Sequence, residues 1–229
     1  AQIDGNRIAE FTRWLEAERG LVFADYNELW GWSITDLDGF WSAIWSFCGI
    51  RSRTPYSQIL ATDEMPGAQW CPGATVNLAD QILHHADSRP NDIALIVHSE
   101  TFGRSEMTWS ALRSRVASVA AHLKNLGVEP GDRIAAVLPN TEVALIAFLA
   151  TASLGAIWSL CAPDMGHVAI LDRFRQIEPK VLIVQDSYVH AGKHVDRRNV
   201  LADITRQLPT LCHVITHAVI GPLPESHLA

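Results

Sequence analysis

The chain has 229 residues, of which 48% are hydrophobic and 19% are charged. This composition excludes a disordered, collagen-like or low-complexity protein, and the length allows one large domain, or one and a half average ones, with a sizeable core. The 18 Lys and Arg against 25 Asp and Glu give a formal net charge of −7, so we expect no nucleic-acid partner held mainly through its phosphates.

Residues 1–75 are rich in tryptophan and are expected to form a helical preface. They hold six of the eight tryptophans, and apolar residues recur at helical spacing around Trp14 and Trp41. Such side chains bury about 150 to 250 Å² each, so we expect short helices that pack against a larger body; a ligand-stacking surface is the alternative. Residues 61–73, with Pro and Gly at 66–67 and 72–73, are expected to be a loop.

From residue 76 onward, strands and helices are expected to alternate. Strands are predicted over residues 92–98, 134–138, 156–160 and 181–184, the first of them buried and the third interior. Helices are predicted between residue 108 and Gly127, over 141–153, through Val168 and Ile177 to Pro179, and near 199–207. Pro130 and Gly131 predict a type II turn. This order predicts an α/β domain over residues 76–229 with a mostly parallel sheet.

One uncharged stretch, residues 143–163, reaches the length of about 20 residues that a membrane helix needs. Gly155 interrupts it and no Lys or Arg flanks it closely, so we expect a buried helix and a strand, and no membrane partner. The four cysteines form no C-x-x-C pair, and the first residues lack the pattern of a secretory signal. Both observations favour reduced thiols in the cytoplasm.

Known phosphate-binding and metal-binding patterns are missing from the sequence. No G-x-G-x-x-G, G-x-x-x-x-G-K-[ST] or G-x-S-x-G motif occurs, so dinucleotide, P-loop and hydrolase functions lack their required loops. His190 and His194 are four residues apart, as are His213 and His217, but both pairs fall in predicted loops or strands. Apart from Cys212 beside His213, no carboxylate or thiol stands at a convincing spacing, so we expect no metal site.

A basic cluster follows the strand predicted at 181–184. It consists of Lys193, Arg197 and Arg198, and α/β proteins bind ligands at the carboxyl ends of parallel strands. A solvated surface segment is the alternative interpretation.

Several long segments together resemble the adenylate-forming superfamily, and within it the amino-terminal part of the acetoacetyl-CoA synthetases. They are WCPGA at 70–74 and residues 40–45, 126–166 and 171–188. The resemblance implies the adenylate-forming enzyme fold and an AMP-forming acid-CoA ligase. In such a ligase the acid attacks the α-phosphorus of ATP, and the CoA thiol then displaces AMP from the acyl-adenylate. The implied small-molecule substrates are acetoacetate, ATP and CoA, with Mg²⁺ beside the ATP.

The resemblance places the residues that bind ATP and Mg²⁺, and the catalytic lysine, beyond residue 229. We therefore expect no catalytic residue in this chain, a catalytically silent protein when it is alone, and an apolar sheet edge and face left exposed. The alternatives are a ligase for acetate or propionate, or a binding or assembly module on the same scaffold.

The resemblance also implies five contacts to the nucleotide part of CoA. Ala162, Pro163 and Asp164 stand where acetyl-CoA synthetases carry an aromatic residue and two glycines, while His190 and Lys193 stand where they carry two arginines. Lys193 keeps the positive charge, and His190 keeps it only when protonated. Asp164 would repel a phosphate.

Overall fold

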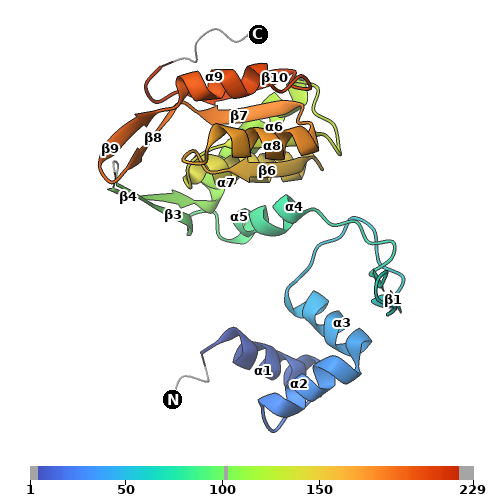
Figure 1. Ribbon diagram of the computed structural model, residues 1–229. Coiled ribbons are helices and arrows are strands. Elements are labelled where there is room, and N and C mark those ends of the chain that lie inside the picture. Colours follow the sequence, from blue (N-terminus) through green and yellow to red (C-terminus); the bar gives the residue numbers. More distant parts are fainter. Residues whose placement is uncertain (1–4, 101–102, 222–229) are drawn as a thin grey trace. The chain divides into compact units, whose positions relative to one another are not determined.

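The computed structural model describes residues 5–100 and 103–221 (Figure 1). The chain divides into two compact units, Ala1–Val76 and Asn77–Ala229, which we call the N-terminal unit and the α/β unit. The N-terminal unit has an aromatic core of its own, while the α/β unit has two core clusters, one on either face of its main sheet.

The N-terminal unit begins with three helices, α1 (Arg7–Arg19), α2 (Tyr26–Thr35) and α3 (Leu37–Phe47). Each begins at a side-chain cap, because Asn6, Asp25 and Asp36 accept hydrogen bonds from backbone N–H groups of the first turn. Such caps satisfy donors that have no partner within the helix. The helix starts are therefore fixed by residues next to them in the sequence.

Aromatic rings fill the space between these helices. Phe11 lies with its ring centroid 5.0 Å from that of Phe47 and 6.1 Å from that of Phe40, and Leu15 beside them is fully buried. The expected helices with large aromatic side chains are confirmed. Trp41 and Trp70 pack edge to face and are 44% and 45% exposed, so the tryptophans are not all interior.

The prediction that residues 61–73 form only a loop is wrong. Two short strands, β1 (Leu60–Thr62) and β2 (Gln69–Trp70), pair antiparallel across this segment. The Pro and Gly residues that suggested a loop lie between β1 and β2 or after β2, where they leave the pairing intact.

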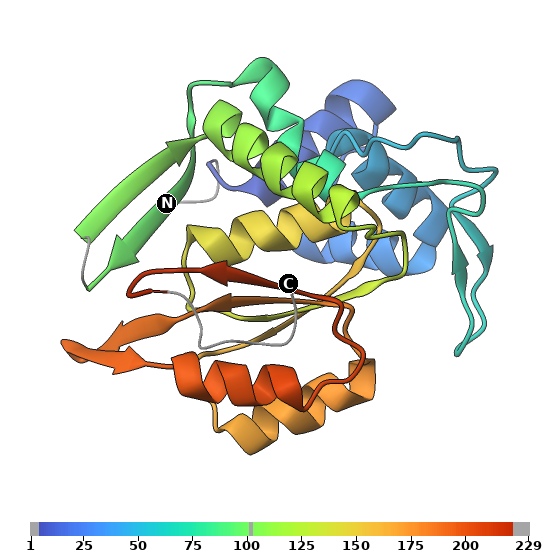
Figure 2. The same cartoon turned by 90° about the horizontal axis from the view of Figure 1, so that it is seen from above.

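The α/β unit is built around a parallel four-stranded sheet with the strand order β10-β7-β5-β6. Its strands are β5 (Arg133–Val137), β6 (Ile157–Cys161), β7 (Val181–Gln185) and β10 (His213–His217). Helices α6 (Trp109–Asn125) and α7 (Glu142–Ser153) cover one face, and α8 (His167–Ile177) and α9 (Arg198–Arg206) cover the other (Figure 2). The predicted fold class, a helical N-terminal region followed by a parallel α/β sheet, is confirmed.

Successive residues of the central strands point to opposite faces of the sheet. In β7, Val181 and Ile183 join the core beneath α6 and α7, whereas Leu182 and Val184 join the core beneath α8 and α9. This is the period of two that a strand imposes. Because both faces are covered, every residue of β7 is buried, which explains the unbroken apolar run in the sequence.

Two of the predicted strands take unexpected places. Residues 92–98 fall mostly in β3 (Ile93–Ser99), which pairs with β4 (Gly103–Thr108) in a separate antiparallel hairpin, and Ile93 and Ile96 are each 48% exposed. The prediction of a buried strand there is wrong. The strand predicted at 156–160 forms as β6, but at the edge of the sheet, where Ile157 is 52% exposed. Local apolar character predicts a strand but not how many neighbours it has.

The other predicted elements form close to their expected positions. Asp132 N donates to Glu129 O at 3.1 Å and Gly131 has φ +87°, as a type II turn requires. Helix α7 follows Thr141, and α8 ends at Ile177 before Pro179. Within the described residues, no helix is both long and apolar enough to cross a membrane.

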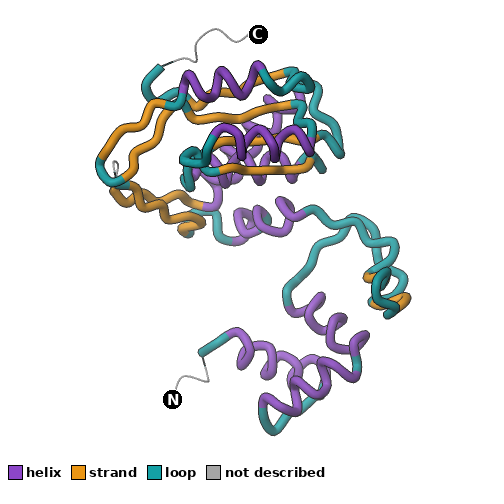
Figure 3. The backbone as a smooth tube through the Cα atoms, viewed as in Figure 1, coloured by secondary structure: helices purple, strands orange, loops and turns teal. Residues whose placement is uncertain are grey.

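Short elements complete the α/β unit. Helix α4 (Leu78–Leu83) is capped by Asn77, whose Oδ1 accepts from Ala79 N and whose Nδ2 donates to Ala152 O near the end of α7. Helix α5 (His85–Ser88) follows, and after β7 the strands β8 (Ser187–His190) and β9 (Lys193–Asp196) form a hairpin. The end of β3 and the turn of the β8–β9 hairpin lie close together, because Gly192 N donates to Glu100 Oε2 (Figure 3).

Candidate functional site

The five residues predicted to contact CoA lie on two segments at the same edge of the sheet. Ala162, Pro163 and Asp164 form the turn after β6, and the β8–β9 hairpin with His190 and Lys193 follows β7. Both segments lie at the carboxyl edge because β6 and β7 are parallel, and β5 lies between the two strands. This is the edge where open α/β sheets bind their ligands.

The turn after β6 exposes a backbone segment and one acid. Ala162 and Asp164 are exposed and Pro163 is buried, while Met165 N donates to Ala162 O at 3.2 Å. A ligand could approach the Ala162 backbone, although the Asp164 carboxylate beside it disfavours a phosphate.

The β8–β9 hairpin places the two predicted cation positions opposite each other. His190 pairs with Lys193 across a two-residue turn in which Ala191 and Gly192 have φ +49° and +72°. Positive φ at both central residues is the geometry of a type I′ turn, which matches the twist of a hairpin. Directly paired residues share a face, with Cβ atoms about 4.5–5.5 Å apart. The side chains of His190 and Lys193, both exposed, could therefore meet one anion.

A carboxylate stands at the tip of this hairpin. Gly192 N donates to Glu100 Oε2 at 3.1 Å, and Glu100 directly follows β3. The Glu100 carboxylate therefore lies next to the turn that joins His190 to Lys193. It occupies the Gly192 N–H, a donor that a bound anion could otherwise use. The sequence analysis missed Glu100 because 92 positions separate the two partners and no pattern links them.

The predicted basic cluster separates into three roles. Lys193 is exposed, whereas Arg198 forms an ion pair with Asp196 in which Nη2 lies 2.7 Å from Oδ2. The hydrogen bond between them lowers the pKa of Asp196 and raises the pKa of Arg198. Arg197 points to the turn after β6, where its Nη2 donates to Met165 O at 3.0 Å.

A buried carboxyl group organises the same edge. Asp186 directly follows β7, and its carboxylate accepts from Val219 N, Ile220 N and Gly221 N at 2.9, 2.8 and 2.8 Å. Burial alone would raise the pKa of Asp186, but these backbone donors outweigh it and hold that pKa below its ordinary value. The sequence analysis missed Asp186, although an acid placed directly after a buried strand is a signal that could have found it.

The histidine pairs do not assemble a metal site. In the β8–β9 hairpin His190 pairs with Lys193 while His194 pairs with Val189, so the two histidines point to opposite faces. Over residues 5–100 and 103–221, no group of three His, Cys, Asp or Glu could hold a metal ion.

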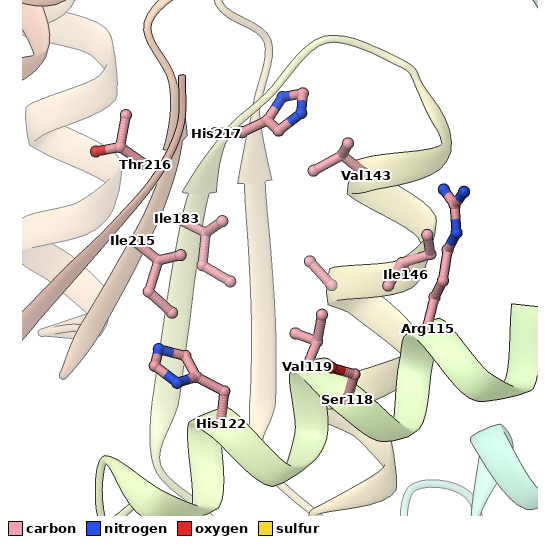
Figure 4. A pocket seen from close by; sticks show the side chains of 11 residues that line it. Arg115, Ser118, Val119, His122, Val143, Ile146, Ile183, Ile215, Thr216 and His217 are labelled. Carbon is pink, nitrogen blue, oxygen red and sulfur yellow. The ribbon is translucent and has the colours of Figure 1, made fainter. Parts of the chain in front are cut away.

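A separate apolar hollow of about 420 Å³ is lined by residues of α6, α7, β7 and β10 (Figure 4). Val143, Ile146, Ile183 and Ile215 form part of its wall, and His122 and His217 lie at its two ends. His217 Nδ1 lies 3.0 Å from Gln185 Oε1 at the carboxyl end of β7. None of the five predicted CoA contacts lines the hollow, so it is distinct from the hairpin site.

Family comparisons cover most of the chain. The family model described as "AMP-binding enzyme" matches residues 82–228, and the one described as "Acetyl-coenzyme A synthetase N-terminus" matches residues 26–82. The two matches therefore meet near the boundary between the two units.

Individual relatives carry related names. The acetoacetyl-coenzyme A synthetase of Rhizobium meliloti (strain 1021) is 34% identical over 94% of this chain and 33% of its own length. The acetoacetyl-CoA synthetase of Mus musculus is 36% identical over 89% of this chain and 30% of its own. A malonamoyl-CoA synthetase of Penicillium aethiopicum is 33% identical over 94% of this chain and 30% of its own. The chain thus spans about a third of the length of the curated relatives it matches.

A solved structure is similar over nearly the whole chain. The acetoacetyl-CoA synthetase from Streptomyces lividans superposes with a TM-score of 0.93 at 44% sequence identity. The match covers 99% of this chain and 35% of that chain.

Proposed function

Because the chain belongs to the AMP-binding enzyme family, we propose that it is the amino-terminal part of an ATP-dependent, AMP-forming acid-CoA ligase. The match to a family model of a synthetase N-terminus supports this placement. Residues 1–75 are then its helical preface, and residues 76–229 the first part of its large adenylating domain. The observation that carries the proposal is the superposition on a solved acetoacetyl-CoA synthetase over 99% of the chain.

We propose acetoacetate as the acid. Relatives from bacteria and vertebrates, as well as the solved structure, are named for the acetoacetyl product. A second candidate is another short acid with a carbonyl group at the same carbon, because the malonamoyl-CoA synthetase matches 94% of the chain. A ligase for acetate or propionate is a further alternative within the class.

The described residues support a role in holding the nucleotide part of CoA. Lys193 offers an exposed ammonium group and His190 an exposed imidazole on the same face of the hairpin, a pair suited to a phosphate when the imidazole is protonated. Ala162, Pro163 and Asp164 would line the opposite side. The nucleotide would thus lie between two segments at the carboxyl edge of the sheet.

The same residues offer little to ATP. Stabilising the charge that develops on a transferring phosphate needs several cations or N–H donors aimed at one point. Among the described residues at the carboxyl edge, which lie between β5 and α7, between β6 and α8, between β7 and α9 and after β10, Lys193 is the one exposed Lys or Arg. We propose that ATP and Mg²⁺ are held by residues outside this chain, and that the chain alone is catalytically silent. We also propose small-molecule substrates, as for other members of the family. We propose a cytoplasmic location as well, which the four free thiols support.

The test separates binding from chemistry. The purified 229-residue chain is mixed with acetoacetate, ATP, Mg²⁺ and CoA, and loss of free CoA thiol is followed, while CoA binding to the same chain is measured by calorimetry. We expect binding without thiol loss. Thiol consumption that depends on acetoacetate and ATP would contradict the silent chain, and absence of CoA binding would contradict the hairpin site.

The acid is tested on the product of the complete reading frame. AMP formation is compared for acetoacetate, malonamate, acetate and propionate at equal concentration. We expect the highest kcat/KM for acetoacetate, and a higher value for any other acid would replace it.

A further inference from the structure

Arg197 stands where three segments of the carboxyl edge meet. Its backbone N donates to Asp186 O at 2.8 Å, which ties it to the end of β7. Its Nη2 donates to Met165 O at 3.0 Å in the turn after β6. The carboxylate of Asp186 in turn holds residues 219–221, beyond β10. A single side chain therefore bridges the two segments that carry the five residues proposed to contact CoA.

The surroundings of Arg197 differ from those of an ordinary surface arginine. Its guanidinium is partly buried, and its Nε is enclosed with no hydrogen-bond acceptor among the residues that the structure describes. Enclosing a charged donor without a partner is unfavourable. The carboxylate of Asp186 does not relieve this cost, because its hydrogen bonds come from the backbone and from Ser187 Oγ. The arginine therefore makes one hydrogen bond across the two segments at the cost of an enclosed Nε without a described acceptor.

We propose that Arg197 is a positioning residue for the CoA site, a role that rests on the proposed function. It holds the turn after β6 at a fixed separation from the β8–β9 hairpin, so that a nucleotide can touch both. Residues 162–166 have no covalent link to the hairpin other than α8, β7 and their connections. The contact from Nη2 to Met165 O links the turn after β6 directly to the segment that follows the hairpin. Its loss should let the turn move more freely relative to Lys193 and His190.

The adjacent Arg198 provides a matched control. It has the same charge and is the first residue of α9, directly after the N-cap residue Arg197, but its guanidinium binds Asp196 on its own segment. Replacing Arg198 removes an equal charge from the same region and leaves the bridge to Met165 in place. Any effect that follows bridging will appear at Arg197 and not at Arg198.

The experiment uses the 229-residue chain with Arg197→Met, Arg197→Lys and Arg198→Met. CoA binding is measured by calorimetry, and hydrogen exchange of the backbone amides in residues 162–166 is measured without CoA. We expect Arg197→Met to weaken CoA binding about tenfold, as loss of the charge-assisted hydrogen bond from Nη2 to Met165 O implies, and to speed exchange in 162–166. We expect Arg198→Met to change binding by less than about twofold, the size typical of an exposed ion pair.

The lysine variant distinguishes position from charge. A lysine can donate one hydrogen bond to Met165 O but lacks the planar fork of arginine. We expect Arg197→Lys to restore part of the exchange protection and part of the affinity. Restoration of full affinity with exchange still fast would show that the charge alone matters and would overturn the proposal.

The remaining outcomes separate this proposal from the proposed function. If Arg197→Met binds CoA with the affinity of the wild type, or if its amides in 162–166 exchange at the wild-type rate, the role of Arg197 is overturned and the hairpin site stands. No CoA binding by the wild-type chain overturns the site itself and the role of Arg197 in it. Circular dichroism verifies folding, and Arg197→Lys decides the case if Arg197→Met does not fold.

Discussion

Different kinds of contact stabilise the interior of each of the two units. The N-terminal unit relies on caps beside each helix and on aromatic contacts such as Phe11 with Phe40 and Phe47. The α/β unit relies on strands whose residues alternate between two cores, and its buried polar groups tie together segments that are distant in the sequence. Polar groups that bond to residues next to them in the sequence fix where helices begin. Polar groups that bond to residues far away in the sequence fix the positions of loops. A ligand site built from several loops depends on these long-range bonds.

The largest expected effect concerns the core of the α/β unit. Phe174 on α8 is fully buried, so Phe174→Ala should lower the free energy of unfolding of this unit by about 3–5 kcal/mol. Six of the eight tryptophans lie in residues 1–75, so their fluorescence reports mainly on the N-terminal unit. In denaturant, circular dichroism should show a much earlier transition while the fluorescence midpoint moves less. Equal shifts in both signals would contradict separate cores.

Val168→Ala on the same helix is the control. Its side chain is 59% exposed, and an exposed substitution of this kind should change stability by no more than about 0.5 kcal/mol.

The next effect concerns the buried tie at Asp186. Asp186→Asn keeps the shape but loses the charge that three backbone N–H groups satisfy, so we expect a loss of about 1–3 kcal/mol near neutral pH. Because the native pKa of Asp186 is lowered, its contribution is complete above the unfolded pKa of about 3.9 and disappears as pH falls through the native value. The stability difference between wild type and variant should therefore shrink below about pH 4.

Chemical denaturation at several pH values measures this difference. Asp203→Asn serves as the control, because Asp203 forms an exposed pair with Arg206 one turn along α9. A stability difference at Asp186 that stays constant down to pH 2 would argue against a charged native carboxylate.

A smaller effect is expected for binding at the hairpin. Lys193→Ala removes an exposed ammonium group, and CoA affinity should fall about fivefold, the upper range for an exposed charge pair. His194→Ala, on the opposite face of the hairpin, should leave affinity unchanged. In the complete enzyme the KM for CoA should rise while adenylate formation is unaffected, and an unchanged KM would remove Lys193 from the site.

The smallest effect is a gain. Glu100→Gln keeps an oxygen that can accept from Gly192 N but removes a negative charge beside the hairpin turn. CoA affinity should rise about twofold at low salt, and the gain should fade as the ionic strength increases. Glu106→Gln, further along β4 beside Arg104, is the control. A gain that persists at high salt would point to a cause other than charge.

The sequence predicts elements better than it predicts their neighbours. The strands predicted from the apolar runs at 134–138 and 181–184 form, and they are the two central strands of the sheet, where burial on both faces removes polar residues from the run. The run at 92–98 looks similar, yet it forms half of an antiparallel hairpin. The partner strand of this run, residues 103–108, is polar, whereas the two central strands pair with each other and are both mostly apolar. Strand neighbours depend on such partners and cannot be judged from one run.

The candidate site shows the same limit. The resemblance supplied His190 and Lys193, and the hairpin register then places them opposite each other. Arg197 was singled out as part of the basic cluster, but its contact to Met165, 32 positions away, was not foreseen. Asp186 and Glu100 were missed, and their partners are 33 to 35 and 92 positions away. A short-range pattern can mark Asp186 as a candidate, but it does not identify the partners of these residues, which come together only after the sheet has formed.

The double role of Asn77 bears on how this protein could be dissected. Its Oδ1 caps α4 and its Nδ2 donates to Ala152 O near the end of α7. Both polar atoms of the side chain of the first residue in the α/β unit are therefore hydrogen-bonded within that unit. If the chain began at Asn77, these hydrogen bonds would still hold its first residue in place. An expression boundary at that residue should therefore yield a soluble α/β unit, which offers a minimal scaffold for crystallography or NMR without the tryptophan-rich helices.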